Sequence, residues 1–315
     1  MYNRTMNIPI TQSKEWQNLQ NDLGEANFFE KTADYQYLAI LKKALVGNYF
    51  YLPYGPVTDS KHGFNKALKS LQTLAQDHSA IFIRIEPQDP NFLSYAPKNI
   101  KKSTDLNPKE TWTLDLTGDD TELKQKLPSR LLRYHKNASQ KGITIETSHD
   151  PQDIKYLLSL QKALASEKGI NTFSEKYLQT ELEQPFATLY LVKYQNPDTN
   201  SKEIIAAGLV FDDNHTRYNL QGAQNATGRK LHATGILTIQ LILDAKAKNL
   251  KTFDFWGIAP ENAPSNHPWA GFTNFKKTFA GQEIDYAGTY DIIINPAKYH
   301  FYQLFRKLNR LLRRA

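Results

Sequence analysis

Cysteine is absent from this chain of 315 residues. Its absence excludes disulfides, thiolate nucleophiles, cysteine-ligated zinc and iron–sulfur clusters. Long apolar runs are also absent: the longest, residues 204–211, has the length of one strand, whereas a membrane span needs about 18–20 residues. The first ten residues contain no apolar run after Arg4, so we expect no signal peptide. We therefore predict a soluble cytoplasmic protein.

The glycines are never two or five positions apart. This spacing excludes the GxG element of dinucleotide-binding and acetyl-CoA pyrophosphate loops, and it excludes the P-loop. The eight histidines form neither an HExxH motif nor an i, i+4 pair, and the chain has no GxSxG nucleophile elbow. Hydrolase and redox chemistry therefore lack their usual signatures.

Positive charge is concentrated at one end of the chain. The net charge is +7, and the last 18 residues contribute +6 of it without a single acid. The rest of the chain is therefore nearly neutral, unlike the uniformly basic surface of a general nucleic-acid coat.

The C-terminal segment reads as an amphipathic helix. Asn295 can cap it, and Pro296 suits its first position. Its apolar residues fall on one stripe, namely Phe301, Leu304, Phe305, Leu308, Leu311 and Leu312. In one interpretation this stripe packs on the core and the basic face is solvated. In the other, residues 296–315 lie on the anionic inner surface of a membrane.

Two parts of the chain repeat an order of three strands, a helix and a fourth strand. The copies align on Tyr51-x-x-x-Gly55 and Tyr218-x-x-x-Gly222. The expected strands are 27–31, 37–41, 48–52 and 80–86 in the first copy, and 188–194, 204–211, 217–220 and 252–256 in the second. We therefore predict a duplicated α+β domain.

A basic helix is expected between the copies, over residues 122–141, after a strand at 111–116. Pro128 interrupts or kinks it, and Gly142 suits its C-terminal end. Its cations outnumber its one acid, Glu122, and are Lys124, Lys126, Arg130, Arg133, Lys136 and Lys141. This helix either has an ordinary solvated, charged face or binds a polyanion.

Several motifs occur in an order that resembles the Fem family of tRNA-dependent aminoacyltransferases, which build the interpeptide bridges of peptidoglycan. They span nearly the whole chain and comprise Gln12-Ser13-x-x-Trp16, residues 52–57 (LPYGPV), 111–116 (TWTLDL), 138–143 (ASQKGI), 222–223, 253–258 (FDFWGI) and 271–281. No insertion of about 30 residues could form a coiled-coil arm, so the chain resembles the compact form of the family.

The resemblance implies a specific α+β fold. It consists of two tandem acetyltransferase-like (GNAT-type) domains, each a mixed sheet with flanking helices, around a central cleft. The expected domains are residues 1–146, with the C-terminal segment 289–315 packing back on them, and residues 147–288.

The reaction that the resemblance implies is aminolysis of an aminoacyl ester by an amine of a peptidoglycan stem peptide. The ester is already activated, so no cofactor or metal is expected. Lys276 matches the family's functional lysine, and its cation suits an oxyanion or a phosphate. Asp115 is a candidate to orient or deprotonate the amine. The structural alternatives are a solvated lysine and an aspartate that bonds a turn.

Binding residues are expected at three places. Arg217 and Tyr218 match the region that holds the precursor, while Tyr54 and Phe275 are further substrate-binding candidates. Aminoacyl-tRNA needs basic surface for its backbone, and the basic helix supplies Arg130, Arg133 and Lys136. The acceptor is a nucleotide-linked or a lipid-linked muropeptide.

Two other functions stay open. One is an acyl-CoA-dependent N-acyltransferase on the same fold, although the missing GxG counts against it. The other is a relative that binds tRNA or membranes without catalysis.

Overall fold

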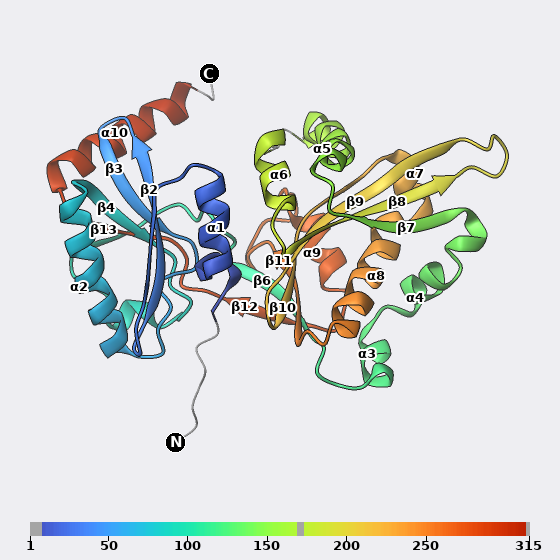
Figure 1. Cartoon of the computed structure of the whole chain (residues 1–315), viewed down its shortest axis with the longest axis horizontal. Helices are drawn as coiled ribbons and strands as arrows, with labels where there is room; N and C mark the ends of the chain where they lie inside the picture. The colour runs from blue at the N-terminus through green and yellow to red at the C-terminus, as the bar shows by residue number, and fades with distance from the viewer. Residues whose placement is uncertain (1–7, 169–172, 313–315) are drawn as a thin grey trace. The chain divides into compact units, whose positions relative to one another are not determined.

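The computed structural model describes residues 8–168 and 173–312. The chain divides into two compact units, which we call unit 1 (Met1–Lys109 with Asp285–Ala315) and unit 2 (Glu110–Ile284). Each unit contains one mixed sheet with flanking helices (Figure 1), which confirms the expected α+β fold. Residues 1–7, where no signal peptide is expected, and the last three residues of the basic tail lie outside the described ranges.

The sheet of unit 1 contains six strands. In spatial order they are β1 (Asn27–Lys31), β2 (Gln36–Ala44), β3 (Gly47–Leu52), β4 (Ala80–Ile85), β13 (Tyr290–Ile293) and β5 (Ile100–Lys102). Only β3 and β4 are parallel, and α2 (Lys61–Asp77) joins them. The penultimate element of the chain, β13, thus lies between β4 and β5.

The two faces of this sheet are covered by different helices. Because side chains alternate along a strand, Ile83 and Ile85 of β4 pack in the cluster formed with α2, whereas Phe82 packs against Tyr299 and Tyr302 of α10 (Pro296–Leu312). Helix α10 therefore covers the sheet with its tyrosines. The interpretation that the apolar stripe of this helix packs on the core was wrong for the described side chains of the stripe, because they are exposed.

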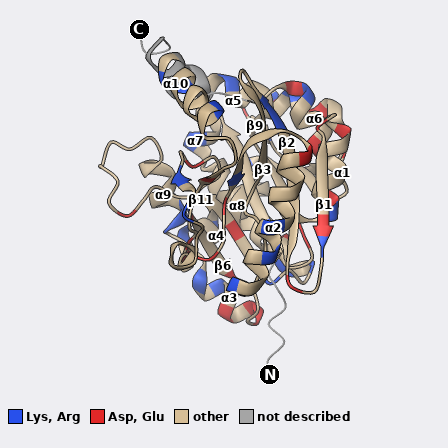
Figure 2. Ribbon diagram, turned by 90° about the vertical axis from the view of Figure 1, so that its left-hand side faces the viewer, with Lys and Arg blue, Asp and Glu red and all other residues tan. Residues whose placement is uncertain are grey.

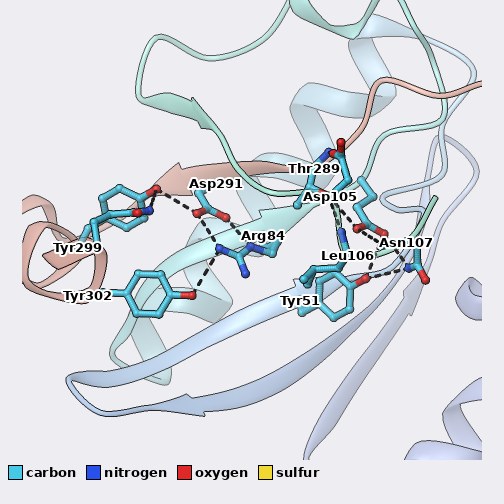
Figure 3. Close-up of polar contacts among 11 residues, drawn as sticks. Tyr51, Arg84, Asp105, Leu106, Asn107, Thr289, Asp291, Tyr299 and Tyr302 are labelled. Atoms are coloured by element: carbon cyan, nitrogen blue, oxygen red, sulfur yellow. Dashed lines mark hydrogen bonds and ion pairs between the residues drawn. The ribbon is translucent and has the colours of Figure 1, made fainter. Parts of the chain in front are cut away.

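A buried ion pair joins β4 to β13 beneath α10 (Figure 3). Arg84 Nε and Nη2 donate to the two carboxylate oxygens of Asp291 at 2.7 and 2.9 Å. The Tyr299 hydroxyl donates to Asp291 Oδ2 at 2.9 Å, and Arg84 Nη2 reaches the Tyr302 hydroxyl at 3.5 Å. The planar guanidinium matches both oxygens at once, which fixes the position of α10 on the sheet.

A second polar hub lies at the end of β4, where the buried Glu86 carboxylate accepts hydrogen bonds from several segments. The donors are the hydroxyls of Tyr51 and Thr289, the side chain and backbone N–H of Asn107, and the backbone N–H of Tyr54. This hub connects β3, β13 and the loop that leads out of unit 1 (Figure 3).

The sheet of unit 2 contains seven strands. In spatial order they are β12 (Gln282–Asp285), β6 (Glu110–Asp115), β11 (Thr252–Gly257), β10 (Thr216–Gln224), β9 (Lys202–Asp212), β8 (Ala187–Gln195) and β7 (Ile143–Ser148). Only β10 and β11 are parallel among the pairs β8–β9, β9–β10 and β10–β11. The run β8 to β11 therefore repeats β1 to β4, which confirms the duplication.

Helices cover both faces of this sheet (Figure 1). On one side lie α5 (Ile154–Lys168) and α6 (Glu175–Leu182), and on the other α8 (Ala233–Ala247), against which α4 packs. The basic helix expected over 122–141 is in fact two helices, α3 (Asp120–Lys126) and α4 (Ser129–Lys136). Leu127 between them has an extended backbone, because the ring of the following proline, Pro128, disfavours the helical conformation of the residue before it.

The boundary between the units differs from the one expected at residue 146. Residues 110–148 belong to unit 2, because β6 pairs with β11 and β7 pairs with β8. Sheet pairing over such sequence distances is not visible in local patterns.

The remaining helices are short. They are α1 (Lys14–Asp22), α7 (Ala226–Leu231), α9 (Ala270–Lys276) and the 3₁₀ turns Ile10–Gln12, Phe92–Ser94, Ser139–Lys141 and Pro151–Asp153. Among residues 8–168 and 173–312, no helix has the length and hydropathy that a bilayer span requires.

We predict that Asp291→Ala strongly destabilises the protein, because it leaves the buried Arg84 charge without its partner. The expected loss is about 3–5 kcal/mol of unfolding free energy, measured by chemical denaturation. The control is Asp34→Ala, which removes an exposed ion pair with Lys66 and should have far less effect. Equal effects of the two substitutions would contradict the role given to the buried pair.

Candidate active site

Lys276, the last residue of α9, is a partly buried cation in unit 2. Its Nζ donates a hydrogen bond of 2.6 Å to the backbone carbonyl of Gly257. Burial lowers the pKa of Lys276 to about 8, and the nearby carboxyl of Asp254 opposes that shift. Lys276 is therefore mostly charged at neutral pH but releases its proton much more readily than an exposed lysine does.

Asp254 is the partner of Lys276 and is buried in β11. The backbone N–H of Trp256 donates to its Oδ1 at 2.7 Å. Burial raises the pKa of Asp254 to about 7, although that N–H and the charge of Lys276 both lower it. A carboxyl and an amine that interact electrostatically thus have nearby pKa values.

The backbone around this pair is irregular. The pairing of β11 with β6 shifts register between Asp254 and Gly257, and Trp256 has a φ of +66°, in the left-handed region that side chains disfavour. Such conformations cost on the order of 1–3 kcal/mol and cluster at functional sites. Here the irregularity brings a backbone N–H to Asp254 and a carbonyl to Lys276.

The two pKa shifts both reduce stability near neutral pH. Asp254 has a raised pKa, so its contribution to stability is lost as pH rises through about 7. Lys276 has a lowered pKa, so its contribution is lost as pH falls through about 8. Buried titratable groups with shifted pKa values next to strained backbone make this segment a candidate for a functional site.

Asp254 is not among the site residues expected from the sequence. The segment 253–258 belongs to the motifs of the family resemblance, but its acid has no predicted role. The available signal was a single carboxyl between Phe253 and Phe255, which the structure buries in the core.

Tyr218 lies beside the pair. It is the register partner of Asp254 in the parallel β10–β11 ladder, and its ring meets the Trp256 ring edge-on at 6.2 Å. Its hydroxyl donates to Asp213 at 2.8 Å. The structure therefore brings Tyr218 to the pair, with its hydroxyl bonded to a turn.

Phe275 precedes Lys276 and packs inward. Its ring meets Phe279 at 5.5 Å and belongs to the fringe of the unit 2 core. It thus anchors the helix turn that carries Lys276.

Asp115 is not brought to this site. It pairs with Thr252, two positions before Asp254 in β11, and its side chain is exposed, whereas that of Asp254 is buried. Its exposed carboxylate accepts bonds from the backbone and hydroxyl of Thr117, and these bonds are the main reason that its pKa lies below the usual value. Asp115 thus stabilises a turn.

The expectation that Arg217 binds the precursor was wrong, because this side chain is fully buried. Its Nε and Nη2 both donate to Asp212 at 2.7 Å, and Nη1 donates to the Tyr190 hydroxyl and the Leu241 carbonyl. The guanidinium is a core ion pair between β9, β10 and α8.

A cavity of about 390 Å³ lies next to this ion pair, between α4, β7 and α8. His135 Nε2 and Gln240 Oε1 are 2.6 Å apart, and Gln240 donates to Asp244 at 2.8 Å. Tyr190 lines the same cavity and accepts a bond from Arg217. Its lining offers imidazole, amide and carboxylate groups to a polar ligand.

Tyr54 belongs to unit 1 and has a structural role there. Its hydroxyl donates to the Pro108 carbonyl at 2.8 Å, and its ring lies 5.0 Å from that of Tyr286. The following Gly55 meets the Gln12 amide, which would lie 2.5 Å from a Cβ at that position. The motif that begins with Gln12 thus contacts the motif at residues 52–57, because the Gln12 side chain packs against Gly55.

The basic residues of α4 surround an aromatic ring. Arg130, Arg133 and Lys136 are exposed. Arg130 Nε donates to the Tyr134 hydroxyl at 2.7 Å, the Arg133 guanidinium lies 6.0 Å from the Tyr134 ring, and His232 stacks on this ring at 4.5 Å. Cations around a stacked aromatic pair are a surface that suits nucleic acid.

Metal-ligating side chains do not gather in the described part of the chain: it holds no group of three His, Asp or Glu residues placed to bind an ion.

Comparisons with known proteins agree with this fold. Residues 180–307 match the sequence model of the FemAB family, while no curated protein matches the chain. The crystal structure of FemX has a TM-score of 0.79 to this chain at 17% sequence identity, covering 94% of this chain and 95% of that one.

Two further solved structures are more distant. The C-terminal domain of a putative lysylphosphatidylglycerol synthetase from Agrobacterium fabrum has a TM-score of 0.62 at 12% identity, covering 95% of this chain and 93% of its own. A tandem GNAT protein from the clavulanic acid biosynthesis pathway has a TM-score of 0.51 at 14% identity, covering 84% and 82%. These likenesses show a shared fold.

We predict that Asp254→Asn lowers the pKa of Lys276 below its value of about 8, because the substitution removes the carboxylate that opposes the effect of burial. The measurement is a pH titration of the ¹³C-labelled ε-methylene groups of the lysines by NMR, with Lys276→Arg used to assign the signal. An unchanged or raised pKa in Asp254→Asn would show that the two groups are not coupled.

Proposed function

We propose that this chain, whose residues 180–307 match the FemAB family model, is an aminoacyltransferase of that family and transfers an amino acid from aminoacyl-tRNA to a stem-peptide amine of a peptidoglycan precursor. The observation that carries this proposal is the buried pair of Lys276 and Asp254 beside the strained backbone at Trp256. The family supplies the substrates of the proposal, and the pair supplies a chemistry that fits them.

The reaction is aminolysis of an ester. The amine nitrogen attacks the ester carbonyl carbon, a C–N bond forms, and the bond to the ribose oxygen breaks. The amine loses a proton and the ribose oxygen gains one, so no oxidant or metal is required. The protein has to hold the two reactants together and to stabilise the oxyanion of the tetrahedral intermediate.

Lys276 is suited to the oxyanion. Its ammonium is partly desolvated, which strengthens its attraction for a developing negative charge. Its hydrogen bond to the Gly257 carbonyl fixes the position of the charge before substrate binds. We assign it the role of stabilising the intermediate.

Asp254 is the better candidate for the proton acceptor than Asp115. A carboxyl with a pKa of about 7 is matched to proton transfer at neutral pH. Asp115, in contrast, is an exposed carboxylate with a lowered pKa whose bonds serve a turn. In this proposal Tyr218 and Phe275 position the loop and the helix turn that bear the pair.

Aminoacyl-tRNA binds, in this proposal, along α4. Arg130, Arg133 and Lys136 neutralise phosphates, and the stacked rings of Tyr134 and His232 accept an unpaired base. The acceptor is a muropeptide linked to a nucleotide or to a lipid, and the reaction takes place on the cytoplasmic side of the membrane, where these precursors and tRNA meet.

We predict that Lys276→Ala reduces transfer about 100-fold, the usual effect of removing one oxyanion-stabilising group. The assay follows the transfer of labelled amino acids from a total aminoacyl-tRNA pool to three acceptors: nucleotide-linked muropeptide, lipid-linked precursor and phosphatidylglycerol. A parallel assay tests a rival donor by following transfer of labelled acetyl groups from acetyl-CoA to muropeptide. Lys277→Ala is the matched control, because it removes the adjacent exposed lysine.

The pH dependence sharpens this test. Wild-type transfer should rise through about pH 7, as Asp254 ionises, and fall above about pH 8, as Lys276 loses its charge. Lys276→Arg, which stays charged, should retain part of the activity and lose the fall above pH 8. Equal activity of Lys276→Ala and wild type would remove the catalytic assignment, and transfer only from acetyl-CoA or only to phosphatidylglycerol would remove the proposed reaction.

We predict that the triple variant Arg130→Ala/Arg133→Ala/Lys136→Ala binds aminoacyl-tRNA at least tenfold more weakly at about 0.1 M salt, and that the slope of log K against log salt falls by about 2. Binding is measured by filter retention over a salt series. The control is Lys155→Ala/Lys162→Ala on α5, which covers the opposite face of the sheet (Figure 1). Equal losses in both variants would indicate a general charge effect.

A further inference from the structure

Helix α10 directs its most apolar face away from the sheet that it covers. Phe301, Leu304, Phe305 and Leu308 are 55%, 48%, 40% and 47% exposed. Their spacing of three and four residues places them on one stripe. A contiguous stripe of four large apolar side chains in water is unusual for a folded protein and indicates a surface with an occupant.

The exposure of the stripe is not a sign of a poorly attached helix. The opposite face carries Tyr299, which is buried and bonded to Asp291, and Tyr302, which packs on Phe82 (Figure 3). At 100° per residue, these tyrosines lie on the side of the helix opposite Leu304 and Leu308. The ion pair beneath α10 therefore fixes which face looks outward.

A turn of the same unit carries a further exposed apolar side chain. Leu45, between β2 and β3, is 81% exposed, and the adjacent Val46 packs in the same small cluster as Tyr302. The hairpin and the helix thus present apolar side chains from two elements of the same unit.

The charges around the stripe indicate what kind of partner can bind to it. On the same helical projection, Lys298 and Lys307 lie on either edge of the stripe. No acid follows Asp291 in the sequence, and Figure 2 shows basic residues and no acidic ones along the described part of α10. Two such helices would repel one another, whereas lipid phosphates complement them.

We propose that α10 is a membrane-docking surface that lies flat on an anionic lipid bilayer. The four apolar side chains enter the boundary between headgroups and acyl chains, and Lys298 and Lys307 contact lipid phosphates beside them. This docking does not depend on the proposed transfer reaction. It would place the protein at the surface where a lipid-linked acceptor resides.

Vesicle sedimentation of the full chain tests the proposal. The two preparations are phosphatidylcholine alone and phosphatidylcholine with about one third phosphatidylglycerol. We expect binding at least tenfold tighter to the anionic vesicles, weakened when NaCl rises from about 0.1 to 0.5 M, because salt screens the lipid charge.

The variant that separates the stripe from the rest of the surface is Leu304→Gln/Leu308→Gln. Both positions are exposed, so the fold should be retained, which circular dichroism and thermal unfolding verify. We expect a loss of at least tenfold in binding to the anionic vesicles. Leu93→Gln is the matched control, because Leu93 is 58% exposed in the same unit, and it should bind as the wild type does.

Three results would overturn the proposal. Wild-type protein that binds neither vesicle has no such surface. Unchanged binding by Leu304→Gln/Leu308→Gln would place the contact elsewhere. A dimer in solution that this variant dissociates would show that a second copy covers the stripe. Lys276→Ala should bind vesicles as the wild type does, so a failure of the transfer reaction and a failure of docking remain distinguishable.

Discussion

The ion pair of Arg84 and Asp291 is the interaction on which unit 1 depends. It joins two strands that are 207 residues apart in the sequence, and it also receives the hydroxyl of Tyr299 from the last helix. Desolvating two charges is costly, and the bidentate geometry with added hydrogen bonds is what offsets it. The pair makes β13 part of the sheet and sets the rotation of α10, so the outward direction of the apolar stripe follows from it.

Unit 2 uses buried charge in two different ways. Arg217 and Asp212 satisfy one another and the groups around them, and the result is a rigid core. Asp254 and Lys276 are less completely satisfied, and their pKa values converge toward neutrality. The difference lies in the irregular backbone around Trp256. It supplies one hydrogen-bond donor to Asp254 and one acceptor to Lys276, fewer bonds than Arg217 and Asp212 make. Unit 2 thus contains one pair whose charges satisfy each other and a second pair whose pKa values are shifted toward neutrality.

The order of strands and helices could be predicted because alternation and helical spacing are local properties of the sequence. The insertion of β13 beside β4 could not, since a short strand reveals nothing of a partner 200 residues away. Arg217 was expected to bind the precursor, because its compensating acid, five residues earlier, looks like an ordinary turn residue in the sequence. Asp254 was overlooked for a related reason: a carboxyl inside an apolar strand becomes notable only when its burial and its cation are known.

The position of β13 also affects how the chain is made. Residues 8–109 are synthesised before residues 290–293, and until these appear they lack an interior strand of their sheet. At about 5–20 residues per second, the interval from Arg84 to Asp291 lasts roughly 10–40 seconds. Meanwhile unit 2, whose strands are contiguous from residue 110 to residue 285, can fold. Until Asp291 is synthesised, residues 8–109 therefore have an open sheet edge at β4, and Arg84 lacks its partner.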